Sequence, residues 1–405
     1  MPWDGAESRV HSPERVLSEP GAFAGRIRVG GRLILDAGQW RLADALGALA
    51  LAFESSDGAE HEAIAVVEGT LRGQTLEHAR VLHARPASRR ALEWERLHRG
   101  GIGSRLVLRA RVLREVRRYF EGQGFLEVDT PQRSAECGTE THVEPIRSGE
   151  SYLITSPELH MKRLLAGGVP NLFALVHCFR AEELGRWHSP EFLMLEWYRA
   201  FAGYTAVLED TERIVHDLWR SVNGDAVLEM PSGARVDFAL PFLRISVREA
   251  FARFAGIGDA PELAARDEDR YFQLLVDRVE PAIAEQGKPV FLYDYPASQA
   301  ALARLSPADP NVAERFELYV SDVELCNGYG ELTDPIEQRA RCESDRVRRR
   351  ELGRHVPEVP ERFLSALLEG MPPASGNALG MDRLIMLLLG QDRIDRVMPF
   401  PSDQA

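Results

Sequence analysis

The pattern of apolar residues changes near residue 86, and this change constrains the fold more than any other feature of the sequence. Before it, short apolar-rich or alternating stretches lie at residues 26–35, 39–45, 49–54, 63–71 and 76–83, separated by clusters of Gly, Asp and Ser. This pattern predicts five short strands, which are typical of a small OB-like β-barrel over residues 26–85. Residues 1–25 are predicted to be an N-terminal tail, and the polar, Arg- and Gly-rich residues 86–104 a linker.

From residue 105 to residue 405, predicted helices and strands alternate. The first helix follows Ser104, which can cap it, and Leu108, Val112 and Val116 recur at helical spacing. Further strands are predicted at residues 151–155, 172–180, 191–198, 291–295 and 316–323, and further helices at residues 158–166, 205–222, 247–254, 269–286, 335–352, 361–369 and 380–389. Short turns join several of the strands, which favours an antiparallel sheet flanked by helices, and so an α+β fold class.

The composition excludes several classes of protein. The 405 residues include 49 basic and 62 acidic ones, and the net charge of −13 excludes a generic basic nucleic-acid binder. No stretch approaches the ~20 apolar residues of a membrane span, and residues 1–25 lack the apolar run of a signal peptide. The four cysteines are widely spaced, which predicts reduced thiols in a cytoplasmic protein and no disulfide or metal cluster.

Three groups of polar residues stand out in the predicted α+β region. The first runs from Phe179-Arg180-Ala181-Glu182 to His188-Ser189-Pro190-Glu191-Phe192, the second is Glu317, Glu324 and Glu331, and the third is the Gly-punctuated segment 376–383. An Arg and a Glu on one strand usually form a structural ion pair, and one Gly-rich turn is a weak signal. Three such groups in this order indicate side chains that converge on one ligand.

Together with residues 124–131, these groups resemble the three motifs of class II aminoacyl-tRNA synthetases. Residues 124–131 are similar to the first motif, 179–196 to the second and 376–386 to the third. The subclass resembled is the lysine type. Within it, the strings Thr155-Ser156-Pro157-Glu158 and Met194-Leu195-Glu196-Trp197-Tyr198 resemble the elongation factor P–(R)-β-lysine ligase family. Ala378 occupies a position where lysine-charging enzymes usually have Gly, whereas the ligase family has Ala there. The sequence departs from that family at Ala181 and Ser189, where Asn is usual.

The resemblance implies ATP and Mg²⁺ as cofactors and two catalytic arginines, Arg180 and Arg383. It places ATP against Arg180, Glu182, His188, Ser189, Phe192, Glu324, Leu325, Gly380 and Arg383. An arginine offers a planar, bidentate donor to phosphate, and Phe192 and Arg383 can stack on the two faces of adenine. Glu317 and Glu324 are predicted magnesium ligands, because two carboxylates beside a triphosphate would repel it without an intervening cation.

The predicted amino-acid substrate is lysine or (R)-β-lysine. The resemblance places it against Ser156, Glu158, Tyr198, Asn327, Glu331 and Ala378. A cationic amino acid needs buried carboxylates that face its ammonium groups. The methyl group of Ala378 is expected to crowd the α-amino side of lysine and to favour the displaced amine of β-lysine.

The expected function is an ATP-dependent ligase that activates this amino acid as the aminoacyl-adenylate and transfers it to a lysine side chain of elongation factor P. The ligase family usually lacks an N-terminal barrel, whereas lysyl-tRNA synthetases use one to bind the anticodon. An abbreviated lysyl-tRNA synthetase therefore stays open as the alternative, although residues 26–85 offer few basic or stacking residues. A non-catalytic paralogue is disfavoured because Arg180, Glu324, Glu331 and Arg383 are all present. The first motif predicts a homodimer.

Overall fold

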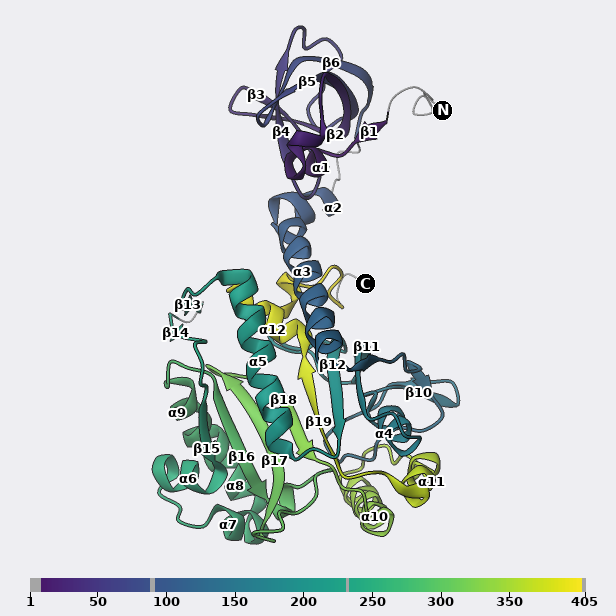
Figure 1. Ribbon diagram of the computed structural model, residues 1–405, viewed down its shortest axis with the longest axis vertical. Coiled ribbons are helices and arrows are strands. Elements are labelled where there is room, and N and C mark those ends of the chain that lie inside the picture. The colour runs from purple at the N-terminus through teal and green to yellow at the C-terminus, as the bar shows by residue number, and fades with distance from the viewer. Residues whose placement is uncertain (1–8, 88–91, 231–232, 403–405) are drawn as a thin grey trace. The chain divides into compact units, whose positions relative to one another are not determined.

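The computed structural model describes residues 9–87, 92–230 and 233–402, which belong to two compact units (Figure 1). The first unit ends at Leu108 and the second begins at Arg109. No helix within the described ranges combines the length and the apolar character that crossing a membrane requires.

The smaller unit is built on five strands. They are β2 (Arg26–Asp36), β3 (Gln39–Ala43), β4 (Ala48–Phe53), β5 (Ile64–Arg72) and β6 (Thr75–Arg85). Their pairings run β2–β3–β4–β6–β5 and return from β5 to β2, so the strands form a closed ring. Alternate residues such as Val29, Leu33 and Val67 are fully buried inside the ring, as the period of two in a half-buried strand requires.

Within the described residues, the predicted tail from residue 9 onward belongs to the ring unit. It contains β1 (Val10–His11), which pairs with β2, the helix α1 (Pro13–Ser18) and the turn η1 (Pro20–Ala22). The Ser12 hydroxyl accepts a hydrogen bond from the backbone N–H of Arg15 at 3.3 Å, and Pro13 occupies the first helical turn. Val16 is fully buried in the ring core, which explains why this short helix is ordered.

The predicted linker also contains helical structure, namely α2 (Leu92–Trp94) and η2 (Glu95–Arg99). Arg96 pairs with Glu93 at 2.7 Å and Arg99 with Glu95 at 3.0 Å. Such pairs stabilise a polar helix that has no apolar stripe, and this is why the hydrophobic pattern did not predict it. The next helix, α3 (Ile102–Gly122), begins two residues before Ser104, so Ser104 lies within the helix instead of capping it.

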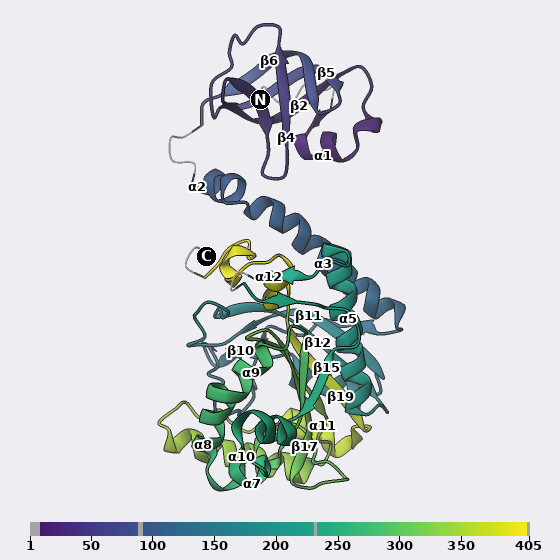
Figure 2. The same ribbon diagram turned by 90° about the vertical axis from the view of Figure 1, so that its left-hand side faces the viewer.

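The larger unit is organised around one eight-stranded sheet. Its order is β15 (Leu243–Ser246), β16 (Val290–Pro296), β17 (Val312–Val320), β18 (Val323–Gly330), β19 (Ala374–Gly380), β12 (Glu191–Ala200), β11 (Asn171–Phe179) and β7 (Leu126–Glu127). The six central strands pair antiparallel, as predicted, and only the edge strands β15 and β7 pair in parallel. Figure 2 shows the long strands of this sheet with helices around them.

Helices cover both faces of the sheet. The principal ones are α4 (Glu158–Ala166), α5 (Tyr204–Asn223), α10 (Pro335–Glu351), α11 (Glu361–Gly370) and α12 (Met381–Leu388). Together with part of α3, α5 and α12 form the largest apolar core with the sheet, whereas α4 and α11 enclose a second core on β11 and β12. A third core lies under α6 (Val247–Ala250), η3 (Phe251–Ala255), α7 (Ala260–Arg266), α8 (Glu268–Leu274), η4 (Leu275–Val279) and α9 (Glu280–Ala284).

Smaller elements complete the larger unit. They are β8 (Arg133–Ser134), β9 (Arg147–Ser148), β10 (Ser151–Leu153), β13 (Leu228–Glu229), β14 (Arg235–Val236), η5 (Ala297–Gln299) and η6 (Ile394–Arg396). The central strands bring the predicted motifs together, because β19 pairs with both β12 and β18. Ala378 is opposite Glu196 on one side and Asn327 on the other. Residues from three segments that are distant in sequence therefore lie side by side on neighbouring strands.

Candidate functional site

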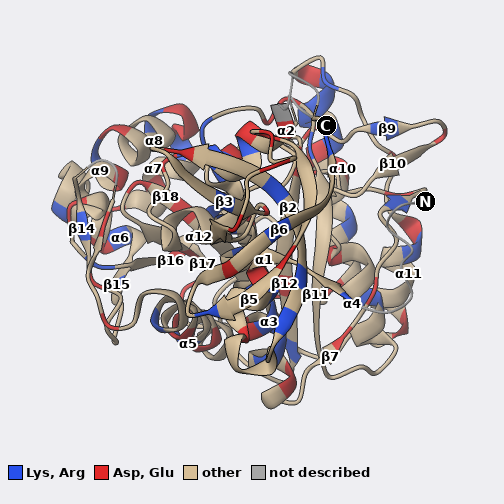
Figure 3. Cartoon of the chain, turned by 90° about the horizontal axis from the view of Figure 1, so that it is seen from above, with Lys and Arg blue, Asp and Glu red and all other residues tan. Residues whose placement is uncertain are grey.

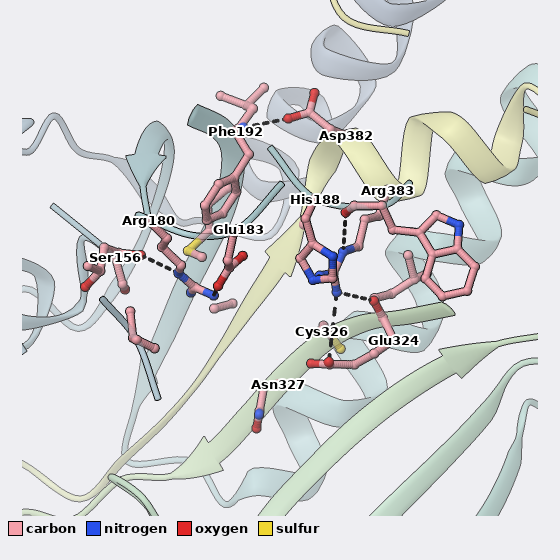
Figure 4. A pocket seen from close by; sticks show the side chains of 18 of the residues that line it. Ser156, Arg180, Glu183, His188, Phe192, Glu324, Cys326, Asn327, Asp382 and Arg383 are labelled. Carbon is pink, nitrogen blue, oxygen red and sulfur yellow. Dashed lines mark hydrogen bonds and ion pairs between the residues drawn. The ribbon is translucent and has the colours of Figure 1, made fainter. Parts of the chain in front are cut away.

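A pocket of about 250 Å³ opens beside these strands (Figure 4). Most of the residues predicted to bind ATP or substrate line it, namely Ser156, Glu158, Arg180, His188, Ser189, Phe192, Glu324, Leu325, Asn327, Ala378, Gly380 and Arg383. Four predicted residues, Glu182, Tyr198, Glu317 and Glu331, do not line it. The pocket therefore collects residues that are up to about two hundred positions apart in the sequence.

Arg180 lies on one wall of the pocket, just beyond the end of β11. Its Nε donates to the carbonyl oxygen of Thr155 at 3.3 Å, and Nη1 lies 3.3 Å from a carboxylate oxygen of Glu183. Its guanidinium carbon is 5.1 Å from the centroid of the Phe192 ring, a cation–π contact that fixes the plane of the donor. Glu183 thus lies where Glu182 was expected, and Glu182 is exposed with a left-handed backbone, φ +65°.

Arg383 lies on the opposite wall, at the start of α12 (Figure 4). It donates to the carbonyl oxygens of Trp187 at 3.1 Å and Glu324 at 2.8 Å, and to Nε2 of His188 at 2.6 Å. Burial and the neighbouring guanidinium lower the pKa of His188. Because an arginine can only donate, Nε2 of His188 accepts, and its proton belongs on Nδ1.

The two predicted magnesium ligands have different environments. Glu324 lines the pocket, and burial and the Glu317 carboxylate raise its pKa. Glu317 is buried and its carboxylate accepts hydrogen bonds from Tyr295 at 2.5 Å, Tyr319 at 2.7 Å, Asn327 at 3.0 Å and Arg315 at 2.6 Å. Over the residues that the structure describes, no group of three or more His, Cys, Asp or Glu side chains could hold a metal ion. Of the two, Glu324 has the more available carboxylate, which lies 3.9 Å from Nη1 of Arg383. Mg²⁺ bound to nucleotide phosphates needs only one or two carboxylates.

Glu158 lines the pocket at what we call its inner end, and a buried cluster of two further carboxylates and one ammonium group adjoins it. Lys162 on α4 is fully buried, and its Nζ lies 2.5 Å from Oε1 of Glu158 and 2.5 Å from Oε2 of Glu331. Glu331 follows β18, and its Oε1 has no hydrogen-bond partner among the described residues. Burial, only partly offset by Lys162, raises the pKa of Glu331 to about 7.

The third carboxylate, Glu196 on β12, is a site residue that sequence reasoning missed. It is 1% exposed and accepts hydrogen bonds from the hydroxyls of Ser156 and Tyr198, both at 2.6 Å. Burial and Glu158 raise its pKa to about 8. A signal was available, because Glu196 is the one charged residue in the apolar run from Phe192 to Tyr198, and buried carboxylates are rare unless they have a role.

Gly376 of the third motif makes this arrangement possible. A Cβ atom at this position would lie 2.3 Å from the Tyr198 ring and 2.9 Å from Oε1 of Glu331. Only glycine therefore lets β19 pass so close to two of the predicted substrate contacts.

The segment 140–144 lies beside the pocket and is held by α10. The side chain of Arg349 is fully buried, and its Nη1 donates to the carbonyl oxygens of Glu140 at 2.7 Å and Val143 at 2.9 Å, while Nη2 pairs with Glu144 at 2.5 Å. Glu140 itself lines the pocket. Sequence reasoning did not identify Arg349, because it is one of several arginines on a polar helix.

The residues present fit a nucleotide at the outer end of the pocket. The Ser189 hydroxyl is buried and has no hydrogen-bond partner within the described part of the chain. It lines the same pocket as Arg180, Arg383 and the Phe192 ring. The arginines are suitable for phosphate, and the aromatic ring is suitable for one face of adenine. The inner end, with its excess of carboxylates, fits ammonium groups.

One antiparallel sheet carries a site suited to a nucleotide beside a cluster of buried carboxylates. The segments that form it occur in the order of the class II motifs, and this arrangement defines a ligase of the class II synthetase type. The family model for class II tRNA synthetases (D, K and N) matches residues 87–404. Among curated relatives, the elongation factor P–(R)-β-lysine ligase of Vibrio cholerae is 40% identical over 323 residues, covering 75% of this chain and 96% of the relative. The proteins of the same name from Edwardsiella ictaluri and Proteus mirabilis are each 41% identical, covering 74% of this chain and 95% of the relative.

The chain therefore belongs to the elongation factor P–(R)-β-lysine ligase family of class II synthetases. It is an enzyme, an ATP-dependent amino-acid ligase.

Proposed function

We propose that the enzyme activates lysine or (R)-β-lysine as the aminoacyl-adenylate and transfers it to a lysine side chain of elongation factor P. The observation that carries this proposal is a pocket lined by arginines and an aromatic ring, whose inner end at Glu158 adjoins a surplus of buried carboxylates. A substrate with a carboxylate at one end and ammonium groups elsewhere matches both ends at once.

In the first step, an oxygen of the substrate carboxylate attacks the α-phosphorus of ATP, and the bond to pyrophosphate breaks. This chemistry needs positioning and charge neutralisation more than a protein nucleophile. Arg180 is assigned to the α-phosphate, His188 to the outer phosphates, and Arg383 to one face of the adenine. Mg²⁺, held by Glu324 and the phosphates, would neutralise charge on the leaving pyrophosphate.

The acidic end of the pocket is assigned to the ammonium groups. Glu158, Glu196 and Glu331 supply three carboxylates, and Lys162 offsets one of them. A diamino acid brings two ammonium groups, which would balance the remaining two carboxylates. A neutral amino acid would leave a carboxylate unpaired in a buried site, at a cost of several kcal/mol.

In the second step, the ε-amine of the acceptor lysine attacks the acyl carbon, an amide forms and AMP leaves. The alternative acceptor is tRNA, which would give a ribose ester. We assign the N-terminal ring as an OB-like barrel that does not bind tRNA. Arg26, Arg28 and Arg80 all lie within 3.5 Å of the Glu68 carboxylate, and Trp40 packs edge-to-face against Phe53. Paired arginines and packed rings offer little to a nucleic acid.

A side-by-side acylation assay tests the acceptor. Radiolabelled lysine or (R)-β-lysine, ATP and Mg²⁺ are incubated with the enzyme and either elongation factor P or tRNA(Lys). We expect label in the protein, stable to mild base, because an amide resists the hydrolysis that releases a ribose ester. Label that appears only in tRNA would overturn the proposal in favour of a lysyl-tRNA synthetase. Since the reaction acts on a translation factor, we place the enzyme in the cytoplasm.

Isomer choice is assigned to Ala378, which lines the pocket between Glu196 and Asn327. One methyl group is worth only ~1–3 kcal/mol, so discrimination should be roughly 10- to 200-fold. Ala378→Gly is expected to improve use of α-lysine relative to β-lysine while the KM for ATP stays the same. The quantity to compare is the ratio of kcat/KM for the two isomers, and an unchanged ratio would remove this assignment.

A further inference from the structure

Lysine is nearly absent from this chain. Of the 49 basic residues, 47 are arginine, and the two lysines are Lys162 and Lys288. Lys288 is only partly buried and donates to the carbonyl oxygens of Ala239 at 3.1 Å and Pro241 at 3.3 Å, outside the pocket. The other lysine is the fully buried cation of the acidic pocket. In a chain that otherwise uses arginine, this position requires a compact ammonium group rather than a broad guanidinium.

The surroundings of Lys162 are strongly acidic. The groups that face or influence its ammonium are Glu158 on its own helix, Glu331 after β18, Glu196 and Tyr198 on β12, Glu140 beside Glu158, and Arg304 near Glu331. Its Nζ bridges Glu158 and Glu331, and the Phe363 ring of α11 lies 6.0 Å away. Burial alone would lower the pKa of Lys162, but Glu158 and Glu331 raise it, so the side chain is charged.

We propose that Lys162 is a positioning residue that supplies the counter-charge to Glu158 and Glu331 and holds both side chains in place, and thereby sets how many ammonium groups the amino-acid pocket accepts. This inference rests on the proposed function and adds a residue to it. Without Lys162, two carboxylates would face each other in a buried site with no counter-charge. Ionising both would then cost free energy, and an ammonium group of the substrate could occupy the vacated position in an unproductive pose.

The first test removes the ammonium group and returns it from solution. In pyrophosphate–ATP exchange with lysine and (R)-β-lysine, Lys162→Ala should lose at least ~10-fold in kcat/KM for the amino acid, while the KM for ATP stays within about twofold. Propylammonium should restore part of the loss, and 1-propanol, a neutral molecule of similar size, should not. Lys288→Ala is the matched control, because it removes the other lysine from outside the pocket and should behave as wild type.

Three results would overturn the proposal. They are a folded Lys162→Ala enzyme with unchanged kcat/KM, equal rescue by propanol and propylammonium, and a loss that falls equally on the KM for ATP. Exchange by the wild-type enzyme separates this inference from the function on which it rests. If wild type fails to exchange with either isomer, the proposed function is wrong. If wild type exchanges normally, a negative result with the variant concerns Lys162 alone.

A second variant keeps the proposal testable if Lys162→Ala does not fold. Lys162→Met fills the same volume beside Phe363 without the charge. Removing the ammonium group raises the folded-state pKa of Glu331 further, so the variant should lose more stability than wild type as the pH rises from 5.5 to 8. The gap in melting temperature between wild type and Lys162→Met should therefore widen from pH 5.5 to pH 8. A gap that does not depend on pH would mean that Lys162 only fills space.

Discussion

At the scale of single residues, the site works through side chains whose orientation is fixed before any ligand arrives. Arg180 is held by Thr155, Glu183 and the Phe192 ring, and Arg383 by two carbonyl oxygens and His188. Preorganised donors of this kind stabilise developing charge without reorganisation during the reaction. The two arginines are therefore expected to affect rate more than folding.

The first prediction concerns Arg180. If Arg180 is the donor to the α-phosphate, as we propose, Arg180→Ala should lower the rate of pyrophosphate exchange at least ~100-fold. Arg163→Ala, at an exposed position on α4 outside the pocket, is the control and should exchange normally. Near-normal exchange by Arg180→Ala would remove this residue from the catalytic assignment.

The second prediction concerns the pH dependence of amino-acid binding. Burial keeps the pKa of Glu196 at about 8, so its carboxyl group is protonated at pH 6 and ionises as the pH rises. A bound ammonium group favours the ionised form, so binding releases a proton and the KM for the amino acid should fall from pH 6 to pH 8.

Glu196→Gln has no proton to release and should flatten this dependence, with the KM for ATP as the internal control. The titration of Glu196 should also make the stability of the enzyme depend on pH, in the direction opposite to binding. Because the folded-state pKa is raised, the contribution of Glu196 to stability is present at low pH and declines as the pH rises through about 8. A KM that falls equally steeply in wild type and variant would contradict the assignment.

At the scale of elements, pairing of β19 with β12 and β18 aligns the second and third motifs with the strand between Glu317 and Glu331, and α10 orders a segment beside them. Arg349 connects α10 to residues 140–144 through hydrogen bonds to backbone carbonyls and the Glu144 carboxylate. The backbone N–H of Ala181 also donates to the carbonyl oxygen of Glu144 at 2.8 Å. This segment thus links α10 to the Arg180 wall of the pocket.

The third prediction follows from this link. Arg349→Met leaves several buried acceptors without a donor, which typically costs ~3 kcal/mol or more. The melting temperature should fall, the KM for the amino acid should rise, and amide exchange at residues 140–144 should accelerate. Arg348→Met is the matched control, because the neighbouring Arg348 is exposed and pairs with the exposed Glu351 at 3.4 Å. Equal effects of the two substitutions would show that Arg349 has no special role.

At the scale of the whole molecule, the distribution of charged residues and the exposed edge of the sheet bear on ligand binding and assembly. Acidic and basic residues are interspersed along the helices of the larger unit (Figure 3), which suits an enzyme that binds small charged ligands in a pocket rather than a polyanion on a surface. The strand β7 forms one edge of the eight-stranded sheet, and its Leu126 is 55% exposed. This edge belongs to the segment that resembles the first, dimer-forming motif.

The fourth prediction is a homodimer, which is the commonest symmetric assembly of soluble proteins. Sedimentation at micromolar concentration should give twice the mass of one chain, and Leu126→Asp should shift the equilibrium toward monomer. His177→Asp, which places an acidic residue elsewhere on the sheet at an exposed position of β11, is the comparison and should stay dimeric. A fully active monomer would contradict the prediction.

The sequence by itself determined the elements and most of the pocket. Helix 158–166 has the predicted bounds, and the predicted strands 172–180 and 191–198 differ from the observed ones by one or two residues. Their apolar period and their caps are local properties of the chain. The single strand predicted at residues 316–323 is instead the two strands β17 and β18. They join at Ser321, which adopts a left-handed φ of +54° although it is not a glycine, so no Gly or Pro marks the turn in the sequence.

Only the tertiary structure decided which polar residues share a buried environment. Lys162 and Arg349 have ordinary neighbours in sequence, and their partners are as far away as Glu331 from Lys162 or Glu140 from Arg349. Glu196 stands out in its apolar run, but its hydrogen-bond partner Ser156 is also distant in sequence. The role of a buried charge depends on the charges that face it, because attraction and repulsion between them act at short range in a medium of low dielectric constant. Local patterns record the path of the backbone, whereas these contacts exist only after distant strands and helices have packed together.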